Sequence, residues 1–205
     1  MIESLTDRRK RLLRDEIARV AIDLFVSSGF DAVTVDDIAA AAGTSQRTFF
    51  RYFATKDDII LDLARRLDRR LLDALDARPD SEGAVTALRN AYRATSHVDP
   101  ADRDRVLQLA AVMAQAPTLR ARAHGEHLNE REQVVERLAL RMGVAPTDPR
   151  VRVLATAMGA VATVEFYRWA DSGGRGNPSD AITRALEMLE SGLAGLDQLG
   201  ANQSA

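Results

Sequence analysis

Apolar residues recur at three- and four-residue spacing along most of the chain, and no segment keeps the two-residue alternation of a half-buried strand. The pattern is clearest over residues 55–77, where Ile59, Leu63 and Leu67 line one face of a long helix. Polar capping residues, several followed by proline, predict where later helices begin. These starts are Ser81, Asp99-Pro100, Pro117-Thr118, Asp148-Pro149 and Asn177-Pro178, with the last helix running to about Leu196. The sequence therefore predicts an all-α fold of about nine helices.

Residues 33–59, VTVDDIAAAAGTSQRTFFRYFATKDDI, contain the start and stop signals of two short helices. Thr34 followed by Asp37 is a capping box, in which the hydroxyl and the carboxylate each accept a free backbone N–H. Gly43 suits a turn that needs positive φ, and Ser45 can cap the next helix. We therefore predict a helix-turn-helix, with its second helix starting after Ser45.

Cations and aromatic rings alternate along that second helix, and no acid occurs from Ser45 to Lys56. At about 100° per residue, one side carries Gln46, Arg47, Phe50 and Arg51, and the other side carries Phe49, Tyr52 and Phe53. A DNA-reading helix needs such a division, because the aromatics anchor it while cations and amides meet the nucleic acid. The alternative is a pair of ordinary core helices, which fits poorly with Phe50 beside two arginines.

The same residues resemble the TetR family of bacterial transcription regulators. The matching positions are Thr34, Ile38-Ala39, Ala42-Gly43, Ser45, Thr48, Phe49-Phe50, Phe53 and Lys56-Asp57, preceded by Ile17, Ala21, Leu24, Phe25, Gly29 and Phe30. The family's usual Val after the glycine is here Thr44, and its frequent Tyr is here Phe50. The resemblance implies a helix-turn-helix DNA-binding domain at residues 1–54 and a helical ligand-binding and dimerisation domain at 55–199. Residues 200–205 are expected to be a disordered tail.

We expect the DNA contacts to come from the helix-turn-helix and the residues just after it. The candidates are Thr34, Thr44, Ser45, Gln46, Arg47, Thr48, Phe50, Arg51, Tyr52 and Lys56. Arg47 and Gln46 are predicted to contact base edges, since Arg pairs with guanine and Gln with adenine. Lys56 is predicted to contact a phosphate at the start of the following helix.

The net charge of −2 agrees with DNA binding only if positive charge is concentrated in part of the chain. Arg8, Arg9, Lys10, Arg11 and Arg14 fall within seven positions that contain no acid. This N-terminal basic cluster is either a solvated, frayed arm or a contact to phosphate or the minor groove. The local arrangement of charge governs phosphate contact more than the total does.

The absence of cysteine excludes disulfides, thiol catalysis and cysteine-ligated zinc. The charged N-terminus does not resemble a signal peptide, and the longest uncharged apolar run, residues 153–164, is too short to span a bilayer. We therefore expect a cytoplasmic protein without a membrane partner. The sequence contains no glycine-rich phosphate-binding loop, no nucleophile-elbow serine motif and no obvious pairing of a histidine with a nucleophile. We therefore predict no enzyme activity and no cofactor.

That apolar run and the final helix predict an interface. Residues 153–164 are apolar all round, and Ile182, Leu186, Leu189, Leu193 and Leu196 follow three-four spacing in the last helix. A single large core is the alternative to an interface. The family resemblance implies that both helices pair with their symmetry mates in a homodimer. Two symmetric heads about one helical turn apart would then bind a palindromic DNA operator.

The resemblance also implies an inducer pocket in the second domain. Candidate wall residues are Tyr92, Leu109, Met113, Met158, Phe166, Tyr167 and Trp169, each of which can equally be plain core. Residues 165–173 resemble actinobacterial regulators whose pocket accepts fatty acyl thioesters. His124 and His127, with Glu126 and Glu130, either face solvent or coordinate a metal, and we predict no metal site.

We therefore expect a DNA-binding regulator, most simply a repressor released by a small apolar or acyl-type ligand. The sequence does not separate repressor from activator. The alternatives are a helical protein-interaction module and a ligand-independent regulator with a solid core.

Overall fold

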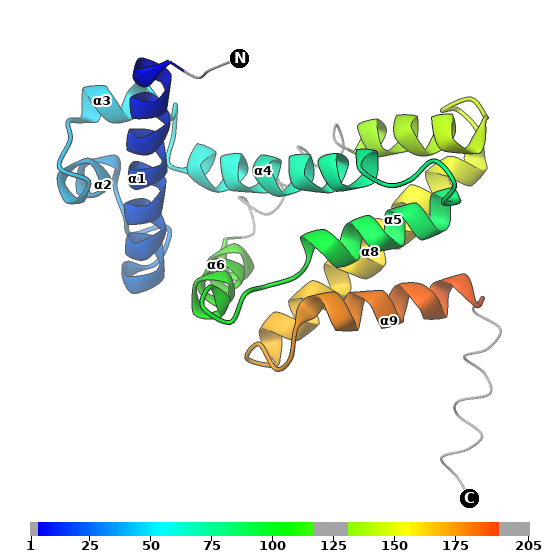
Figure 1. Ribbon diagram of the computed structural model, residues 1–205. Helices are drawn as coiled ribbons and strands as arrows, with labels where there is room; N and C mark the ends of the chain where they lie inside the picture. Colours follow the sequence, from blue (N-terminus) through cyan, green and yellow to red (C-terminus); the bar gives the residue numbers. More distant parts are fainter. Residues whose placement is uncertain (1–3, 117–130, 193–205) are drawn as a thin grey trace, which may run out of the picture. The chain divides into compact units, whose positions relative to one another are not determined.

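The computed structural model describes residues 4–116 and 131–192, and every regular element among them is an α-helix (Figure 1). The labelled helices are α1 (Leu5–Ser28), α2 (Val35–Ala41), α3 (Gln46–Phe50), α4 (Asp57–Asp76), α5 (Ala84–Thr95), α6 (Arg103–Gln115), α8 (Pro149–Asp171) and α9 (Pro178–Glu190). Residues 131–142 form a further helical segment. The predicted all-α fold is confirmed.

The chain forms two compact units. The first unit contains residues 1–65 and 108–126, and the second contains 66–107 and 127–205. Helices α4 and α6 therefore each contribute residues to both units. The predicted functional division into 1–54 and 55–199 stays a prediction, and packing groups the start of α4 and the end of α6 with the N-terminal helices. The predicted tail at 200–205 lies outside the described residues.

In the first unit, α1, α2 and α3 enclose one apolar core together with the start of α4 and the end of α6. Its largest fully buried side chains are Phe25, Phe49, Ile17, Ile38, Ile59 and Leu61. Phe49 comes from the short α3, and its ring lies 5.8 Å from that of the buried Phe53. These aromatics hold α3 in place, because a five-residue helix has little stability of its own.

In the second unit, α8 packs against α9 and α5, and α5 packs against α9. The core is apolar and includes Leu72, Leu88, Leu138, Met158, Ile182 and Leu186. Two predicted helix starts are confirmed here. Asp148 caps α8 and Asn177 caps α9, each with proline in the first helical turn.

The predicted start at Ser81 is wrong, because α5 begins at Ala84 after the cap residue Gly83. The preceding segment is a loop that Arg141 stabilises. Its guanidinium donates to the carbonyls of Arg78, Pro79 and Glu82 at 2.6–3.1 Å. Those carbonyls therefore bond to a side chain far away in the sequence instead of starting a helix, which no local signal reveals.

Two other predicted ends also shift. Asp99 accepts from the N–H of Ala101 in a turn, and α6 begins at Arg103 rather than at Pro100. The last helix ends at Glu190 rather than near Leu196, since Gly192 adopts a φ of 90° that terminates it. The predicted start at Pro117-Thr118 lies outside the described residues.

Candidate nucleic-acid interface

The turn between α2 and α3 is built by the local signals that predicted it. Asp37 N–H donates to the Thr34 hydroxyl at 3.2 Å, and Thr34 N–H donates to the Asp37 carboxylate at 2.9 Å. The Thr34 hydrogen bonds lower the pKa of Asp37, because they stabilise the charged form. Gly43 has a φ of 62°, and Ser45 accepts from the N–H of Thr48 at the start of α3. The predicted capping box and turn are confirmed.

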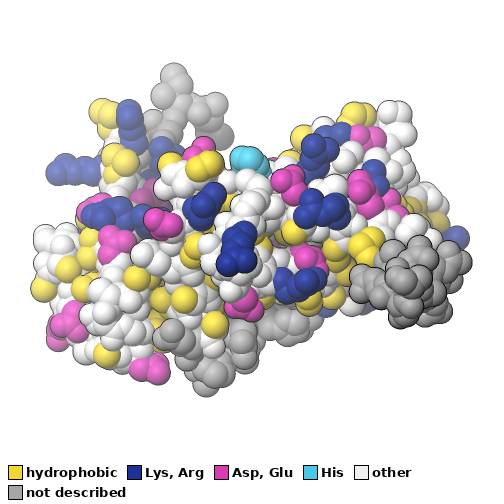
Figure 2. All heavy atoms as spheres, turned by 90° about the horizontal axis from the view of Figure 1, so that it is seen from below, with side chains coloured by type: hydrophobic (Ala, Val, Ile, Leu, Met, Phe, Trp, Pro, Cys, Tyr) yellow, Lys and Arg dark blue, Asp and Glu magenta, His cyan; other side chains and the backbone are white. Residues whose placement is uncertain are grey.

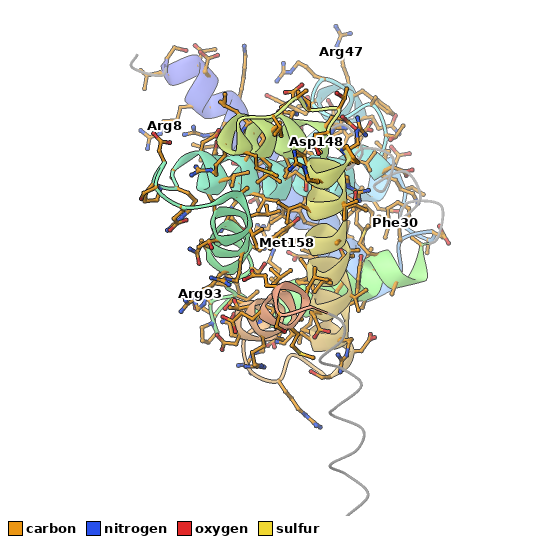
Figure 3. The ribbon with its side chains drawn as sticks, turned by 90° about the vertical axis from the view of Figure 1, so that its right-hand side faces the viewer. Arg8, Phe30, Arg47, Arg93, Asp148 and Met158 are labelled. Atoms are coloured by element: carbon orange, nitrogen blue, oxygen red, sulfur yellow. The ribbon has the colours of Figure 1, made fainter. Side chains whose placement is uncertain are left out.

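Helix α3 buries one side and exposes the other, as its pattern predicts. Phe49 and Phe53 are buried, whereas the Phe50 side chain is 53 % exposed and meets Phe49 edge-on at 5.5 Å. Arg47 is exposed in the first turn of α3, and no described residue pairs with its guanidinium. In Figure 3 the Arg47 side chain extends away from the ribbon. Among the described residues, α3 thus presents an exposed cation without an ion-pair partner in its first turn and an exposed apolar ring at its end.

The other polar side chains of this surface have partners within the protein. The Gln46 amide donates to the Asp36 carboxylate of α2. The Arg51 guanidinium donates to the Tyr52 hydroxyl at 3.1 Å and lies 5.1 Å from the centre of its ring. Contact of Gln46 with a base would therefore require it to leave Asp36, whereas Arg47 needs no such exchange. The predicted DNA contacts of all these residues stay predictions.

Lys56 is held more tightly than a phosphate-binding lysine needs to be. Its ammonium donates to the carbonyls of Phe30, Asp31 and Val33 at 2.7, 3.2 and 2.9 Å. It also lies 4.7 Å from the centre of the Phe30 ring. All three N–H donors of the ammonium are therefore used within the first unit.

The N-terminal basic cluster forms the first turns of α1, which begins at Leu5 after the cap residue Ser4. Arg8 and Arg9 are exposed there, and Arg8 is labelled in Figure 3. The Arg14 side chain is instead only partly exposed and packs against the first unit. Its guanidinium donates to the carboxylate of the largely buried Asp62 at 2.8 Å and lies 5.1 Å from the centre of the Phe53 ring. Sequence reasoning missed this ion pair. The lone acid in the apolar run Ile59–Leu63 was the available signal.

Charges on the described surface are mixed in sign. On the face drawn in Figure 2, basic and acidic side chains alternate and do not gather into one field. Several arginines pair with acids in the second unit, as Arg89 does with Glu190 and Arg152 with Glu132. Arg47 has no such partner among the described residues, and its place in the first turn of the second helix of the helix-turn-helix makes the start of α3 the best candidate for contact with a polyanion.

The predicted pocket residues fall into both units. Leu109 and Met113 pack against the core of the first unit. In the second unit, Met158 is buried and Tyr92 and Phe166 pack against the core. The Phe166 ring lies 5.7 Å from both the Tyr167 and the Trp169 rings. These positions neither establish nor exclude a ligand wall, which stays a prediction.

Tyr92, Tyr167 and Trp169 carry the O–H and N–H groups of this set. Burial raises the pKa of Tyr92 to about 12, and nearby Asp68 adds to the shift, because both disfavour the phenolate. The Trp169 indole N–H donates to the Gly176 carbonyl at 3.1 Å and so closes the loop between α8 and α9. Trp169 therefore has a structural role whether or not it also contacts a ligand.

Helix α8 exposes part of its apolar run. Val153 and Val164 are 66 % and 56 % exposed, and Met188 of α9 is 46 % exposed. A shallow depression on α8 is lined by Arg152, Val153, Thr156 and Ala157. These exposed apolar side chains agree with the predicted interface better than with burial in a single core.

Within the described ranges, no group of three or more His, Asp or Glu side chains is placed to hold a metal ion. His124 and His127, the two histidines considered as ligands, lie outside those ranges. None of the described helices has the length and apolar character needed to cross a membrane.

Comparison with known proteins agrees with this architecture. Residues 17–63 match the family of bacterial regulatory proteins called tetR, and residues 82–194 match the MftR C-terminal domain. MftR of Mycobacterium tuberculosis, named as a regulator of mycofactocin biosynthesis, is 33 % identical over 96 % of this chain and 98 % of its own. The transcriptional regulator TcmR of Streptomyces glaucescens is 32 % identical over 82 % of this chain and 79 % of its own.

A solved structure adds a liganded relative. The transcriptional repressor FadR of Thermus thermophilus, in complex with lauroyl-CoA, matches with a TM-score of 0.61 and 26 % identity. The match covers 88 % of this chain and 94 % of FadR. All these relatives are transcriptional regulators rather than enzymes. The chain belongs to the TetR family of bacterial transcriptional regulators.

Proposed function

We propose that this protein is a homodimeric repressor that binds a palindromic operator and leaves it when a small apolar or acyl-type ligand binds. The observation that carries operator binding is the exposed Arg47 at the start of α3, with which no residue of the described ranges pairs. Side chains at the first turn of such a helix reach base edges in the major groove. A protein-interaction module, the alternative, would show no sequence preference among DNA duplexes.

Dimer formation is supported by the exposed apolar side chains of α8 and α9. Val153, Val164 and Met188 would be covered by the same surface of a second copy, as in a two-fold interface. Analytical ultracentrifugation tests this directly. The wild-type protein should sediment as a dimer, and Val153→Glu should shift it toward monomer. A wild-type monomer at micromolar concentration would contradict the proposal.

The ligand proposal rests on a relative rather than on a cavity in this chain. FadR of Thermus thermophilus binds lauroyl-CoA and shares 26 % identity over most of both chains. The aromatic side chains at the end of α8, Phe166 and Tyr167, are partly buried and would suit an apolar chain. We therefore expect an acyl chain of medium length to bind the second unit.

Release would require the ligand to favour a conformation that binds DNA poorly. Helix α4 is the natural route, because its residues belong to both units and it directly follows the helix-turn-helix. A tenfold loss of operator affinity corresponds to a coupling free energy of only about 1.4 kcal/mol. This value lies within the usual range for ligand-controlled regulators.

The experiment has two stages. The protein is first used to select duplexes from a random-sequence library, which should yield a palindrome. The selected duplex is then titrated with protein in the presence of lauroyl-CoA, with coenzyme A alone and laurate alone as controls. Weaker DNA binding with lauroyl-CoA but not coenzyme A would support release. Thermal stabilisation by lauroyl-CoA without loss of DNA affinity would contradict the coupling. No stabilisation by either acyl compound would favour the alternative, a ligand-independent regulator with a solid core.

A further inference from the structure

We propose that Lys56 is a positioning residue that joins the two ends of the helix-turn-helix and does not itself bind DNA phosphate. The proposal rests on the operator binding proposed above. It starts from the three carbonyls of Phe30, Asp31 and Val33, which converge on the Lys56 ammonium at 2.7–3.2 Å. They belong to the segment between α1 and α2, whereas Lys56 directly precedes α4.

The hydrogen bonds of Lys56 within the protein use every donor of its ammonium group. An ammonium has three N–H donors, and each finds a carbonyl oxygen here. Hydrogen bonds from a charged donor are shorter and stronger than neutral ones, and the 2.7 Å bond to Phe30 fits that description. The carbonyls of Phe30 and Val33 are stabilised as well, because their bonds to Lys56 are partly buried and a buried carbonyl without a partner is costly.

The Phe30 ring anchors the arrangement to the core. The ammonium lies 4.7 Å from the ring centre, within the range of a cation–π interaction. The same ring lies 4.9 Å from that of Phe25, whose side chain is almost fully buried. Phe30, labelled in Figure 3, thus connects Lys56 to the core of the first unit.

The hydrogen bonds of Lys56 connect the two ends of the helix-turn-helix. Val33 precedes Thr34, the cap residue of α2, and Lys56 follows the turn after α3. The bonds from Lys56 therefore close residues 33–56 into a ring that contains both α2 and α3. Loss of these bonds would let the cap of α2 move against α3, and the DNA-contacting surface would lose its preformed shape.

A contact between Lys56 and a DNA phosphate would require the ammonium to give up these partners. The ammonium would have to leave three carbonyls and an aromatic ring to bond to DNA, and those carbonyls would lose their partner. Replacement of a true phosphate contact lowers the slope of log affinity against log salt by about one per contact. Replacement of a positioning residue weakens binding and leaves that slope unchanged.

The first test uses the protein without DNA, so that it does not depend on the proposed function. Hydrogen exchange is measured in wild type and in Lys56→Met, which keeps the apolar stem and removes the donors. The Thr34 amide, which is protected by Asp37, should exchange about tenfold faster in the variant. The Thr48 amide, bonded to Ser45, should not change. Lys10→Met, at the chain's other lysine, serves as the matched control and should leave both amides unchanged.

The second test measures binding to a random-sequence duplex between 50 and 300 mM salt. Lys56→Met should bind about tenfold more weakly with an unchanged salt slope. Lys56→Arg separates the two roles again. The broad, planar guanidinium cannot place three donors on the same carbonyls, so this variant should also lose affinity and amide protection.

The proposal would be overturned if Lys56→Met lowered the salt slope by about one per protomer and left the Thr34 amide protected. Wild-type affinity in Lys56→Arg would overturn it as well, since a phosphate accepts either cation. Failure of all variants and of the wild type to bind any duplex would instead refute DNA binding, while the exchange result would still decide the role of Lys56.

Discussion

The ion pair between Arg14 of α1 and Asp62 of α4 should be among the largest polar contributions to the stability of the first unit. Their side chains are 36 % and 8 % exposed, and the Nη2–Oδ1 distance is 2.8 Å. The guanidinium also stacks 5.1 Å over the buried Phe53, just after α3. The pair therefore connects α1 to α4 and lies against the aromatic side chain that helps to hold α3 in place.

The magnitude follows from the unequal burial of the two side chains. Removal of one partner from a fully buried pair costs about 3–5 kcal/mol, because the other charge is left without compensation. Arg14 retains access to water, so the lower range for hydrogen bonds to charged groups applies, about 1.5–3 kcal/mol. We expect Asp62→Ala to lower the free energy of unfolding by that amount.

The assay is urea denaturation followed by circular dichroism on Asp62→Ala, Arg14→Met and the double variant. Methionine keeps the length of the Arg14 stem and removes the guanidinium that lies over Phe53. The cycle should give a coupling energy above about 1 kcal/mol. Arg19→Met, on the same helix but in an exposed contact with Glu16 and Asp23, is the matched control and should change stability far less. A coupling energy below about 0.3 kcal/mol would refute the reasoning.

Two further predictions concern the second unit. Gly159→Val should lower stability by about 1–3 kcal/mol in the same urea assay, because an added Cβ would already lie 3.2 Å from the Tyr92 hydroxyl oxygen. An unchanged midpoint would show that Tyr92 moves aside freely. Hydrogen bonds from the Arg150 side chain, the main cause, lower the pKa of Asp148 to about 2. The folded-state pKa lies below that of an ordinary Asp, so this carboxylate contributes its full stability above about pH 4 and loses it as the pH falls through 2. The stability difference from Asp148→Asn should therefore shrink as the pH falls below 4, and a difference as large at pH 2 as at neutral pH would contradict that account.

The helix-turn-helix could be predicted because its signals are local. Thr34 bonds to Asp37 and Ser45 to Thr48, each three residues away, and Gly43 adopts the positive φ that the turn needs, as the sequence indicates. The starts of α8 and α9 followed for the same reason. The Asp148 carboxylate and the Asn177 amide oxygen each accept one of the first free N–H groups of the helix that follows.

The helix start at Ser81 was predicted wrongly because a distant residue decides it. The segment at residues 78–82 stays a loop because Arg141 bonds to its carbonyls. The three carbonyls that hold Lys56 lie 23–26 positions earlier in the chain, so spacing along the sequence could not identify them either. The pocket stays a prediction, and its candidates Leu109 and Met158 belong to different units of the fold.

The central claim is that the start of α3 contacts bases in DNA, and base preference measures it most directly. Wild type, Arg47→Ala and Arg93→Ala are each used to select duplexes from one random library. Arg93, exposed on α5 and labelled in Figure 3, controls for general loss of positive charge. We predict that wild type and Arg93→Ala select the same palindrome. Arg47→Ala should lose preference at one position in each half-site, with a discrimination loss of about 1–3 kcal/mol. An identical base preference at every position in all three proteins would contradict the assignment of Arg47 and, with it, the proposed mode of operator recognition.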